Sequence, residues 1–300
     1  MKTKRATEGR WRKLGWWGAR ITVPEHWEPA RLGTRYLLLE DGRANVFEAR
    51  WEPVGRRTDP EGVLDRLARA RGMTRSLVQE RLNPRWAMAV RAFDAATGFS
   101  WSYDGQSGKG AVLLCGQCGH MILLQFLGGA NVSEETAARV LSSFTDHAGG
   151  DAVPWTVFDV SAHMPADFTL LRHRFHPGQF EMVFAHGRDT WTLHRWGPAD
   201  ALLAGRDLVG WSGGIVPRLC EVRGDPATRD TTANSVEWEA CPGMDAFDQL
   251  RGRLSLKPTH FWCHIWRVPE KNRILCVSYT GKGAHDPALA ERICDGYAAR

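Results

Sequence analysis

The sequence predicts an α+β protein made of two tandem copies of one antiparallel-sheet α/β sandwich. Three observations support this fold class. The chain has 300 residues, which suits two domains, since single domains commonly contain about 100–150 residues. Short strand-like runs separated by glycine turns fill much of each half, and each half closes with an amphipathic helix. The same features recur in the same order in both halves, as expected for a duplication.

The duplication is visible as three paired motifs at a nearly constant spacing along the chain. The first motif is a Pro-x-x-aromatic turn, the second a Gly-Arg turn, and the third an Arg-Trp pair followed by a proline. In chain order the pairs are Pro24-x-x-Trp27 with Pro165-x-x-Phe168, Gly42-Arg43 with Gly187-Arg188, and Arg50-Trp51-x-Pro53 with Arg195-Trp196-x-Pro198. We therefore expect a basic N-terminal tail over residues 1–18, a first repeat over residues 19–147 and a second repeat over residues 155–300.

The first elements of the first repeat are strands. A short strand containing Ile21 and Val23 ends at the Pro-x-x-Trp turn. Two further strand-like runs, 36–40 and 45–51, flank Asp41-Gly42. Asp-Gly between such runs is a strong hairpin signal, because both turn positions need a positive φ.

Helices and further strands follow in the first repeat. Pro60 suits the first position of a helix, and the apolar residues between Val63 and Ala68 recur at helical spacing. A second helix is expected over Thr74–Leu82, stopped by Asn83-Pro84. The remaining expected elements are strands at 99–103, 111–115 and 121–127 and a closing helix at 133–147.

The second repeat follows the same plan. Residues 185–188 are expected to form its hairpin turn, and the run Arg273–Tyr279 corresponds to the last strand of the first repeat. A closing helix is expected over residues 286–299. Between the repeats, the segment 147–154 contains two glycines and a proline, which are typical of a linker.

The strand, the Pro-x-x-Trp turn, the long meander and the C-terminal helix together resemble the PsbP-like fold, known from extrinsic photosystem II subunits and a small Ran-binding protein. The resemblance covers both repeats. Members of this fold are mostly non-enzymatic binding or assembly factors, so the resemblance implies a binding role and transfers no catalytic residues. The export signal of the photosynthetic members is not found in this sequence, which argues against a role in a photosystem.

Composition and charge indicate a cytoplasmic protein that is not associated with a membrane. Apolar residues make up 43% of the chain and charged residues 24%, as in ordinary globular proteins. No run approaches the roughly 18 apolar residues of a membrane span, and the charged N-terminal region lacks the apolar core of a secretory signal. Seven cysteines, an odd number without framework spacing, indicate free thiols in a reducing compartment.

The sharpest local motif is Cys115-Gly-Gln-Cys118-Gly-His120. Two thiols at this spacing can hold one metal ion, because a tight turn brings both sulfur atoms to the same side, and His120 can add a third ligand. Zinc is the expected metal, although a tetrahedral zinc site needs a fourth ligand and the chain has no second Cys-x-x-Cys. A thiol-redox motif and an ordinary hairpin turn that carries two thiols are the alternatives.

Arginine and tryptophan residues form a second candidate site. Arg50-Trp51 and Arg195-Trp196 recur in both repeats, and Trp16 and Trp17 lie in the basic N-terminal region. One interpretation is an exposed binding surface, since Trp and Arg are enriched at protein-binding hot spots. The alternative is a buried tryptophan covered by the stem of an arginine, a structural feature that both repeats share.

Two further clusters have weaker functional interpretations. Trp11, Trp16 and Trp17 alternate with basic residues, a pattern that suits either nucleic-acid binding or docking of this segment onto the first sheet. A second arginine-rich stretch runs from residue 56 to 91. Four histidines lie close together in the sequence and could form a metal site: His173, His176, His186 and His194. Residues three apart, such as His173 and His176, point to opposite faces of a strand, so surface or edge positions are the simpler interpretation.

Signature motifs of common enzymes are not found in the sequence. It contains no P-loop, no HExxH motif and no GxSxG nucleophile elbow. We therefore predict a non-catalytic cytoplasmic protein-binding or assembly factor that uses no cofactor and whose partner is another protein. The alternatives are a metal-binding protein with zinc, or a thiol-redox protein, using the turn from Cys115 to His120, and nucleic-acid binding through the basic N-terminal region.

Overall fold

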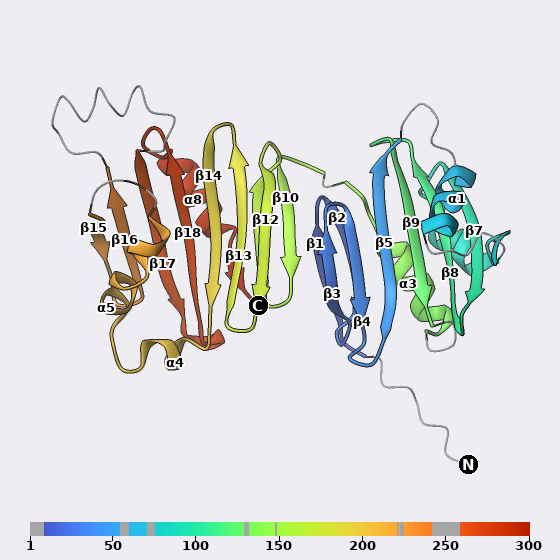
Figure 1. The fold of residues 1–300 in the computed structure, drawn as a ribbon, viewed down its shortest axis with the longest axis horizontal. Coiled ribbons are helices and arrows are strands. Elements are labelled where there is room, and N and C mark those ends of the chain that lie inside the picture. The colour runs from blue at the N-terminus through green and yellow to red at the C-terminus, as the bar shows by residue number, and fades with distance from the viewer. Residues whose placement is uncertain are drawn as a thin grey trace, which may run out of the picture. The chain divides into compact units, whose positions relative to one another are not determined.

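The computed structural model describes residues 9–54, 60–70, 76–128, 132–147, 149–220, 222, 225–241 and 259–300. The chain divides into two compact units, Met1–Phe158 and Asp159–Arg300 (Figure 1). Each unit contains a seven-stranded sheet whose neighbouring strands are antiparallel, together with several helices. The prediction of an α+β fold with antiparallel sheets is confirmed.

The sheet of the first unit has the strand order β3-β4-β5-β9-β8-β7-β6. Outside this sheet, β1 (Trp11–Trp16) pairs with β2 (Ala19–Pro24) and with β10 (Ala152–Val157). The sheet strands are β3 (Glu28–Gly33), β4 (Tyr36–Glu40), β5 (Asn45–Pro53), β6 (Leu77–Glu80), β7 (Ala95–Tyr103), β8 (Gln106–Cys115) and β9 (His120–Leu127). The helices of this unit are α1 (Pro60–Ala70), α2 (Pro84–Ala89) and α3 (Glu134–Ser143).

Helices pack against both faces of the first sheet because its central strands are apolar on both sides. On one face, Trp51 of β5 contacts Phe144 at the end of α3, with ring centroids 6.1 Å apart. On the other face, Leu64 of α1 belongs to a buried cluster with Leu123 of β9 and Trp101 of β7. Side chains alternate between faces along a strand, and this double burial explains why β8 and β9 are nearly continuous apolar runs.

The sheet of the second unit has the strand order β12-β13-β14-β18-β17-β16-β15. Its strands are β12 (Thr169–His176), β13 (Gln179–His186), β14 (Asp189–Trp196), β15 (Ala227–Thr231), β16 (Ser235–Ala240), β17 (His260–Val268) and β18 (Arg273–Gly281). The further elements are the paired strands β11 (Val160–Pro165) and β19 (Ala298–Ala299), the 3-10 turn η1 (Pro269–Lys271), and the helices α4 (Ala199–Leu203), α5 (Leu208–Gly213), α6 (Val216–Leu219) and α8 (Pro287–Asp295).

The second sheet is also covered on both faces. Trp196 of β14 packs edge-on against Trp211 of α5, with centroids 5.5 Å apart, in the core under α4, α5 and α6. On the opposite face, Trp266 of β17 contacts Tyr297, the second residue after α8, at 6.0 Å. Ile293 of α8 is buried as well.

The prediction of a tail over residues 1–18 differs from the structure, in which Trp11–Trp16 form β1. The reason is burial, since Leu14 and Trp16 are only 2% and 1% exposed. Arg12 forms an ion pair with Glu28 of β3. Residues 1–8 lie outside the described residues.

The predicted helix over Thr74–Leu82 is wrong for its described part. Leu77–Glu80 form β6, which pairs with β7 through neighbours such as Leu77 and Trp101. Hydrogen bonding to the open edge of β7 outweighs the weak local preference for helix. The helix expected from 133 to 147 is shorter and ends at Ser143, and the expected linker contains the beginning of β10.

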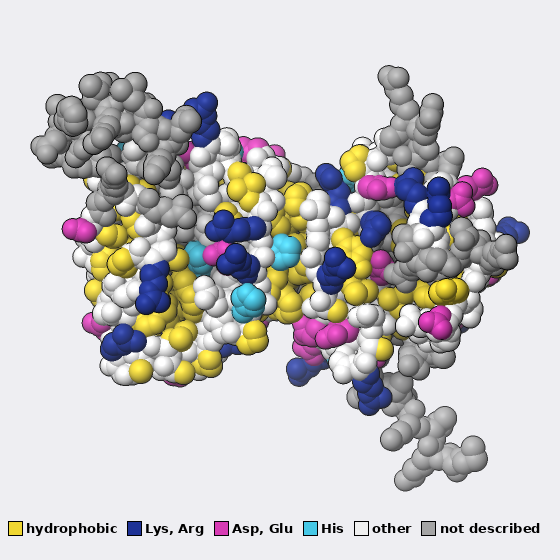
Figure 2. All heavy atoms as spheres, viewed as in Figure 1, with side chains coloured by type: hydrophobic (Ala, Val, Ile, Leu, Met, Phe, Trp, Pro, Cys, Tyr) yellow, Lys and Arg dark blue, Asp and Glu magenta, His cyan; other side chains and the backbone are white. Residues whose placement is uncertain are grey.

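Charge is mixed on one face of the molecule. On the face drawn in Figure 2, Lys and Arg side chains lie among acidic, apolar and neutral ones over both units. No helix among the described residues is long and apolar enough to cross a membrane.

Candidate metal centre

The hairpin between β8 and β9 carries the Cys-x-x-Cys motif. Cys115 ends β8, His120 begins β9, and Cys118 lies in the turn between them. The backbone N–H of Gly119, at a φ of +66°, donates to the carbonyl oxygen of Cys115 at 2.9 Å, which closes the turn. Asp94 accepts a hydrogen bond from the N–H of Gly116 at 2.6 Å. The turn is therefore held from both inside and outside the hairpin.

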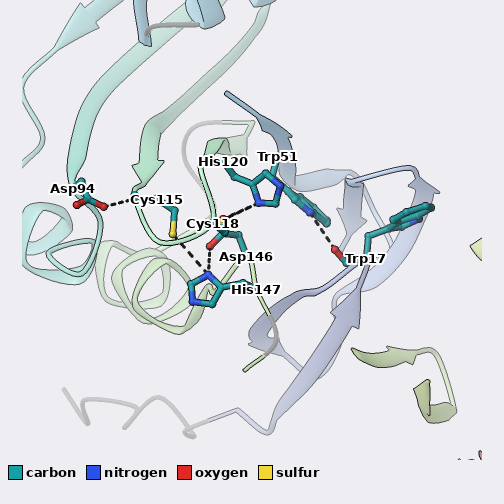
Figure 3. A network of polar contacts seen from close by, with 9 residues as sticks. Trp17, Trp51, Asp94, Cys115, Cys118, His120, Asp146 and His147 are labelled. Carbon is teal, nitrogen blue, oxygen red and sulfur yellow. Dashed lines mark hydrogen bonds and ion pairs between the residues drawn. The ribbon is translucent and has the colours of Figure 1, made fainter. Parts of the chain in front are cut away.

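The segment after α3 brings two more polar side chains to this hairpin. Thr145 forms a two-way backbone bridge with Arg20 of β2, at 2.7 and 2.9 Å. This bridge fixes the backbone next to Asp146 and His147. Figure 3 shows both side chains pointing toward Cys115, Cys118 and His120.

Five side chains converge at this point. Asp146 is central: its Oδ2 lies 2.5 Å from Cys118 Sγ and 3.1 Å from His120 Nδ1, and its Oδ1 lies 3.0 Å from His147 Nδ1. Cys115 Sγ lies 3.7 Å from His147 Nδ1, and Cys118 Sγ lies 3.1 Å from His120 Nδ1. One ligand atom from each of Cys115, Cys118, Asp146 and His147 lies within 4.8 Å of the others.

Electrostatics make Asp146 an anchor for positive charge. Its side chain is fully buried. Burial raises the pKa of Asp146, but hydrogen bonds from Cys118 and His147 lower it further than burial raises it, so the net pKa lies below the usual value. Burial and the hydrogen bond to this carboxylate raise the pKa of Cys118 to about 12. Without a cation, Cys118 is therefore a protonated thiol that donates to Asp146.

The cluster fits a thiophilic metal ion. Two cysteines, one imidazole and one carboxylate form a ligand set that suits zinc, whereas calcium and magnesium prefer oxygen ligands alone. Ligand atoms around tetrahedral zinc lie about 3–4 Å apart, as follows from Zn–S and Zn–N bonds of about 2.3 and 2.0 Å. The separations here, from 2.5 Å to at most 4.8 Å, come close to that spacing. A bound cation would also favour the thiolate forms of both cysteines.

The sequence motif identified part of this cluster. The predicted residues Cys115, Cys118 and His120 do come together in the structure. Asp146 and His147 were missed, because they were assigned to the end of a helix and to a linker. The signal that marks them is an Asp-His pair that begins three residues after the end of an amphipathic helix, but only the fold shows that it faces the hairpin.

The predicted binding surface does not exist as one exposed patch. Trp16 and Trp51 are 1% exposed, and Arg195 and Trp196 are 6% exposed. Trp17 is half-buried and Arg50 is exposed. The structural alternative explains these residues: Trp16 donates its indole N–H to the Gly33 carbonyl, and Arg195 pairs with Asp159.

The two Arg-Trp pairs occupy opposite faces of their sheets. Trp51 lies on the α3 face, whereas Trp196 lies under α5, and the face of α8 is occupied by Arg195. The aromatic residues of the two Pro-x-x-aromatic turns each contact a residue of the following strands, and these contacts show the reason. Trp27 contacts Phe47, and Phe168 contacts Trp191, each at 6.3 Å. Trp51 follows Phe47 by four residues and Arg195 follows Trp191 by four, so Trp51 and Arg195 take the same strand position relative to these contacts.

The basic N-terminal segment packs on its own unit. The Arg139 guanidinium lies 3.9 Å over the ring of Trp11, and Arg12 donates to Glu28. These contacts correspond to the docking interpretation of the segment, and nucleic-acid binding stays an untested prediction.

Of the four histidines, His186 pairs with Asp167 at 3.0 Å and His194 is buried.

Comparison with known proteins gives distant structural likenesses only. No protein-family model matches the chain, and no curated protein matches it. The chain is similar to the Ran-binding protein Mog1p of Saccharomyces cerevisiae, at 11% identity and a TM-score of 0.33, over 49% of this chain and 95% of that one. It is similar to the type VI secretion immunity protein TplEi of Pseudomonas aeruginosa, at 10% identity and a TM-score of 0.33, over 97% of both chains. With identities and TM-scores this low, these likenesses do not indicate a shared function.

Proposed function

We propose that the first unit is a zinc-binding module, in which Cys115, Cys118, Asp146 and His147 hold one zinc ion in a structural role. The observation that carries this proposal is the convergence of these four ligand atoms within 4.8 Å. His120 supports the site by hydrogen bonding to Asp146 at 3.1 Å, as neighbouring groups commonly orient metal ligands.

A structural role follows from the number and the placement of the ligands. Four protein ligands complete a tetrahedral shell, whereas catalytic zinc sites keep one position open for water or substrate. The ligands come from two places far apart in the sequence, the β8–β9 hairpin and the segment after α3. Zinc therefore ties the closing segment of the unit to the centre of its sheet.

The test is the zinc content of the full chain, purified without a polyhistidine tag. We expect about one zinc ion per chain, bound tightly enough to survive dialysis. Cys118 takes part in two of the contacts described above and Asp146 in three, so Cys118→Ser and Asp146→Asn should both lose the metal. Cys241→Ser is the matched control, because this cysteine is exposed and lies outside the cluster.

A chelator supplies the second readout. Removing zinc should lower the melting temperature of the wild type and leave that of Cys118→Ser unchanged, since a ligand that binds only the folded state stabilises it by mass action. A wild-type chain without zinc after expression in zinc-supplemented medium, or equal zinc in all variants, contradicts the proposal.

Protein binding is the second candidate function, and the observation that favours it is the edge strand β12. Among the described residues, β12 pairs with β13 alone, so its other edge is available to an added strand. Leu171 on this strand is 59% exposed. We expect a pull-down from the native host to recover a stoichiometric partner with the wild type and not with Leu171→Lys. Equal recovery with both chains, or no partner with either, counts against this function.

The two units are further proposed to be duplicated copies of a PsbP-like sandwich in a cytoplasmic protein. Support comes from the strand orders of the two sheets, which correspond position by position from β3 and β12 to β6 and β15. All seven cysteines are free, as is usual in a reducing compartment.

A further inference from the structure

The second unit contains a cavity of about 540 Å³ on the sheet face that also carries α4, α5 and α6. Its floor is polar. Thr192 of β14 lies directly opposite Ser278 of β18, and Thr190 lies opposite Thr280, so four hydroxyl groups form two adjacent rungs. In Figure 2, basic and histidine side chains gather over β13 and β14, which line this cavity.

The polar floor begins where the helical cover ends. Ile274 and Cys276, on the same face of β18, belong to the core under the helices. Two residues further on, the same face presents Ser278 and then Thr280 to the cavity. The change from apolar to hydroxyl side chains along one strand face indicates a surface arranged for a polar ligand, because core packing requires neither hydroxyl.

His194 lies at the inner end of this floor and has an unused nitrogen. The residue is 3% exposed and lines the cavity. Its Nδ1 is buried and makes no hydrogen bond with any described residue. Buried polar atoms are nearly always hydrogen-bonded, because leaving one unpaired costs on the order of 1–3 kcal/mol of desolvation. A ligand group in the cavity would satisfy this atom.

Four cations surround the cavity. Arg172 pairs with Glu181 at 3.2 Å, while Arg188, Arg218 and Lys282 are in no ion pair among the described residues. Glu181 is the only acidic residue in the described part of the lining, where the cations exceed the acids by three. Arginine recognises carboxylate and phosphate groups through paired charge-assisted hydrogen bonds.

We propose that the second unit binds a small organic oxyanion, in which a carboxylate or phosphate group meets the arginine rim and a polar portion reaches the hydroxyl floor and His194. The volume falls within the range of about 300–1,000 Å³ that is usual for small-molecule pockets. His194 is suited to such a ligand as a neutral donor or acceptor, since burial lowers its pKa to about 4. The cationic rim makes an uncharged ligand the poorer match.

The test is calorimetric binding of defined probes to the full chain. Succinate represents carboxylates and glycerol 2-phosphate represents phosphates, with succinamide and glycerol as their uncharged counterparts. We expect saturable binding of at least one oxyanion at one site per chain, weakened by added salt, and none of either uncharged probe. The oxyanion that binds more tightly shows whether the natural ligand carries a carboxylate or a phosphate group.

Variants locate the site. Arg218→Ser removes an exposed rim cation, and we expect a loss of affinity of about tenfold, as is typical for one charge-assisted hydrogen bond. Arg43→Ser removes an exposed cation in the first unit and should leave the affinity unchanged. His194→Phe replaces the imidazole by another aromatic ring without nitrogen atoms, and should weaken binding by a similar factor while the chain remains folded by circular dichroism.

Two results would overturn this inference. One is the lack of saturable binding of either oxyanion up to about 10 mM, where even a weak site of millimolar Kd would be occupied. The other is equal affinity of the wild type, Arg218→Ser and Arg188→Ser, which remains informative even where His194→Phe fails to fold. Because the probes are poor zinc chelators and the site lies in the second unit, neither result depends on the metal centre.

Discussion

His194 is a buried histidine whose charge state depends on the fold. Burial lowers its pKa from 6.5 to about 4, while Glu181 raises it and Arg172 lowers it to smaller extents. Between these two pH values the unfolded chain binds a proton at this position and the folded chain does not. The free energy of unfolding therefore falls as the pH drops from 6.5 toward 4, by an amount on the order of 3 kcal/mol, and this contribution is constant above 6.5.

The check is urea unfolding of the wild type and His194→Phe at pH 7 and at about pH 4.5, since the phenylalanine variant lacks the titrating group. We expect the wild type to lose more stability than the variant between the two values. His176→Phe, at an exposed position on β12, should behave like the wild type. An equal loss in His194→Phe and the wild type would contradict the predicted titration.

At the scale of single residues, the sequence predicts chemistry best where the functional groups are close along the chain. Cys115, Cys118 and His120 lie on one turn, so their spacing alone brings them together. Asp146 and His147 join them only because Thr145 pairs with β2, a contact that no local pattern encodes. The same holds for the cavity at His194, which is lined by residues of separate strands.

At the scale of elements, strand β8 contains a glycine that the sheet requires. A Cβ atom at Gly110 would lie 2.2 Å from the carbonyl oxygen of Leu124 in the neighbouring strand β9 and 2.8 Å from the ring of Phe99 in β7. The clashing atom belongs to the backbone, so side-chain rotation cannot relieve it. Overpacking of this kind typically costs about 1–3 kcal/mol.

We therefore expect Gly110→Ala to lower the free energy of unfolding by about 2 kcal/mol or more in urea titrations. Gly149→Ala is the matched control, because no atom lies within 4 Å of a Cβ built there. Equal free energies of unfolding for Gly110→Ala and the wild type would contradict this prediction. Such a result would mean that β8 and β9 can move apart to make room for the methyl group at no cost in stability.

Element types were easier to predict than strand register. Hairpins such as β4–β5 follow from the Asp41-Gly42 turn, and the apolar runs of β8 and β9 reflect burial on both faces. The two Arg-Trp motifs look alike in the sequence, but their tryptophans lie on opposite faces of their sheets. A shift of one residue is enough to move a side chain to the other face of a sheet. The strand β6 was missed because an edge strand takes its conformation from its partner, here β7, more than from its own residues.

At the scale of the whole molecule, the order of elements could be predicted because similar motifs occur in the same order in both halves of the sequence. Each half contains a Pro-x-x-aromatic turn, a meander and a closing helix, and each unit shows these elements around a sheet of the same strand order. The two units differ in the chemistry that they carry and in where it lies on the sheet. The first carries the thiol cluster on its β8–β9 hairpin, and the second carries the cationic cavity over β13, β14 and β18.

Hydrogen exchange on the full chain can show separately where zinc and the oxyanion bind. A ligand slows exchange most in the elements whose opening would release it, because opening then costs the binding free energy as well. Zinc should protect the backbone amides of 115–120 and 145–147 relative to the chelated chain. Succinate or glycerol 2-phosphate, whichever binds, should protect β13, β14 and β18 instead. Protection by zinc that is spread evenly, or concentrated in β13 and β14, would mean that the metal binds somewhere other than the cluster around Asp146.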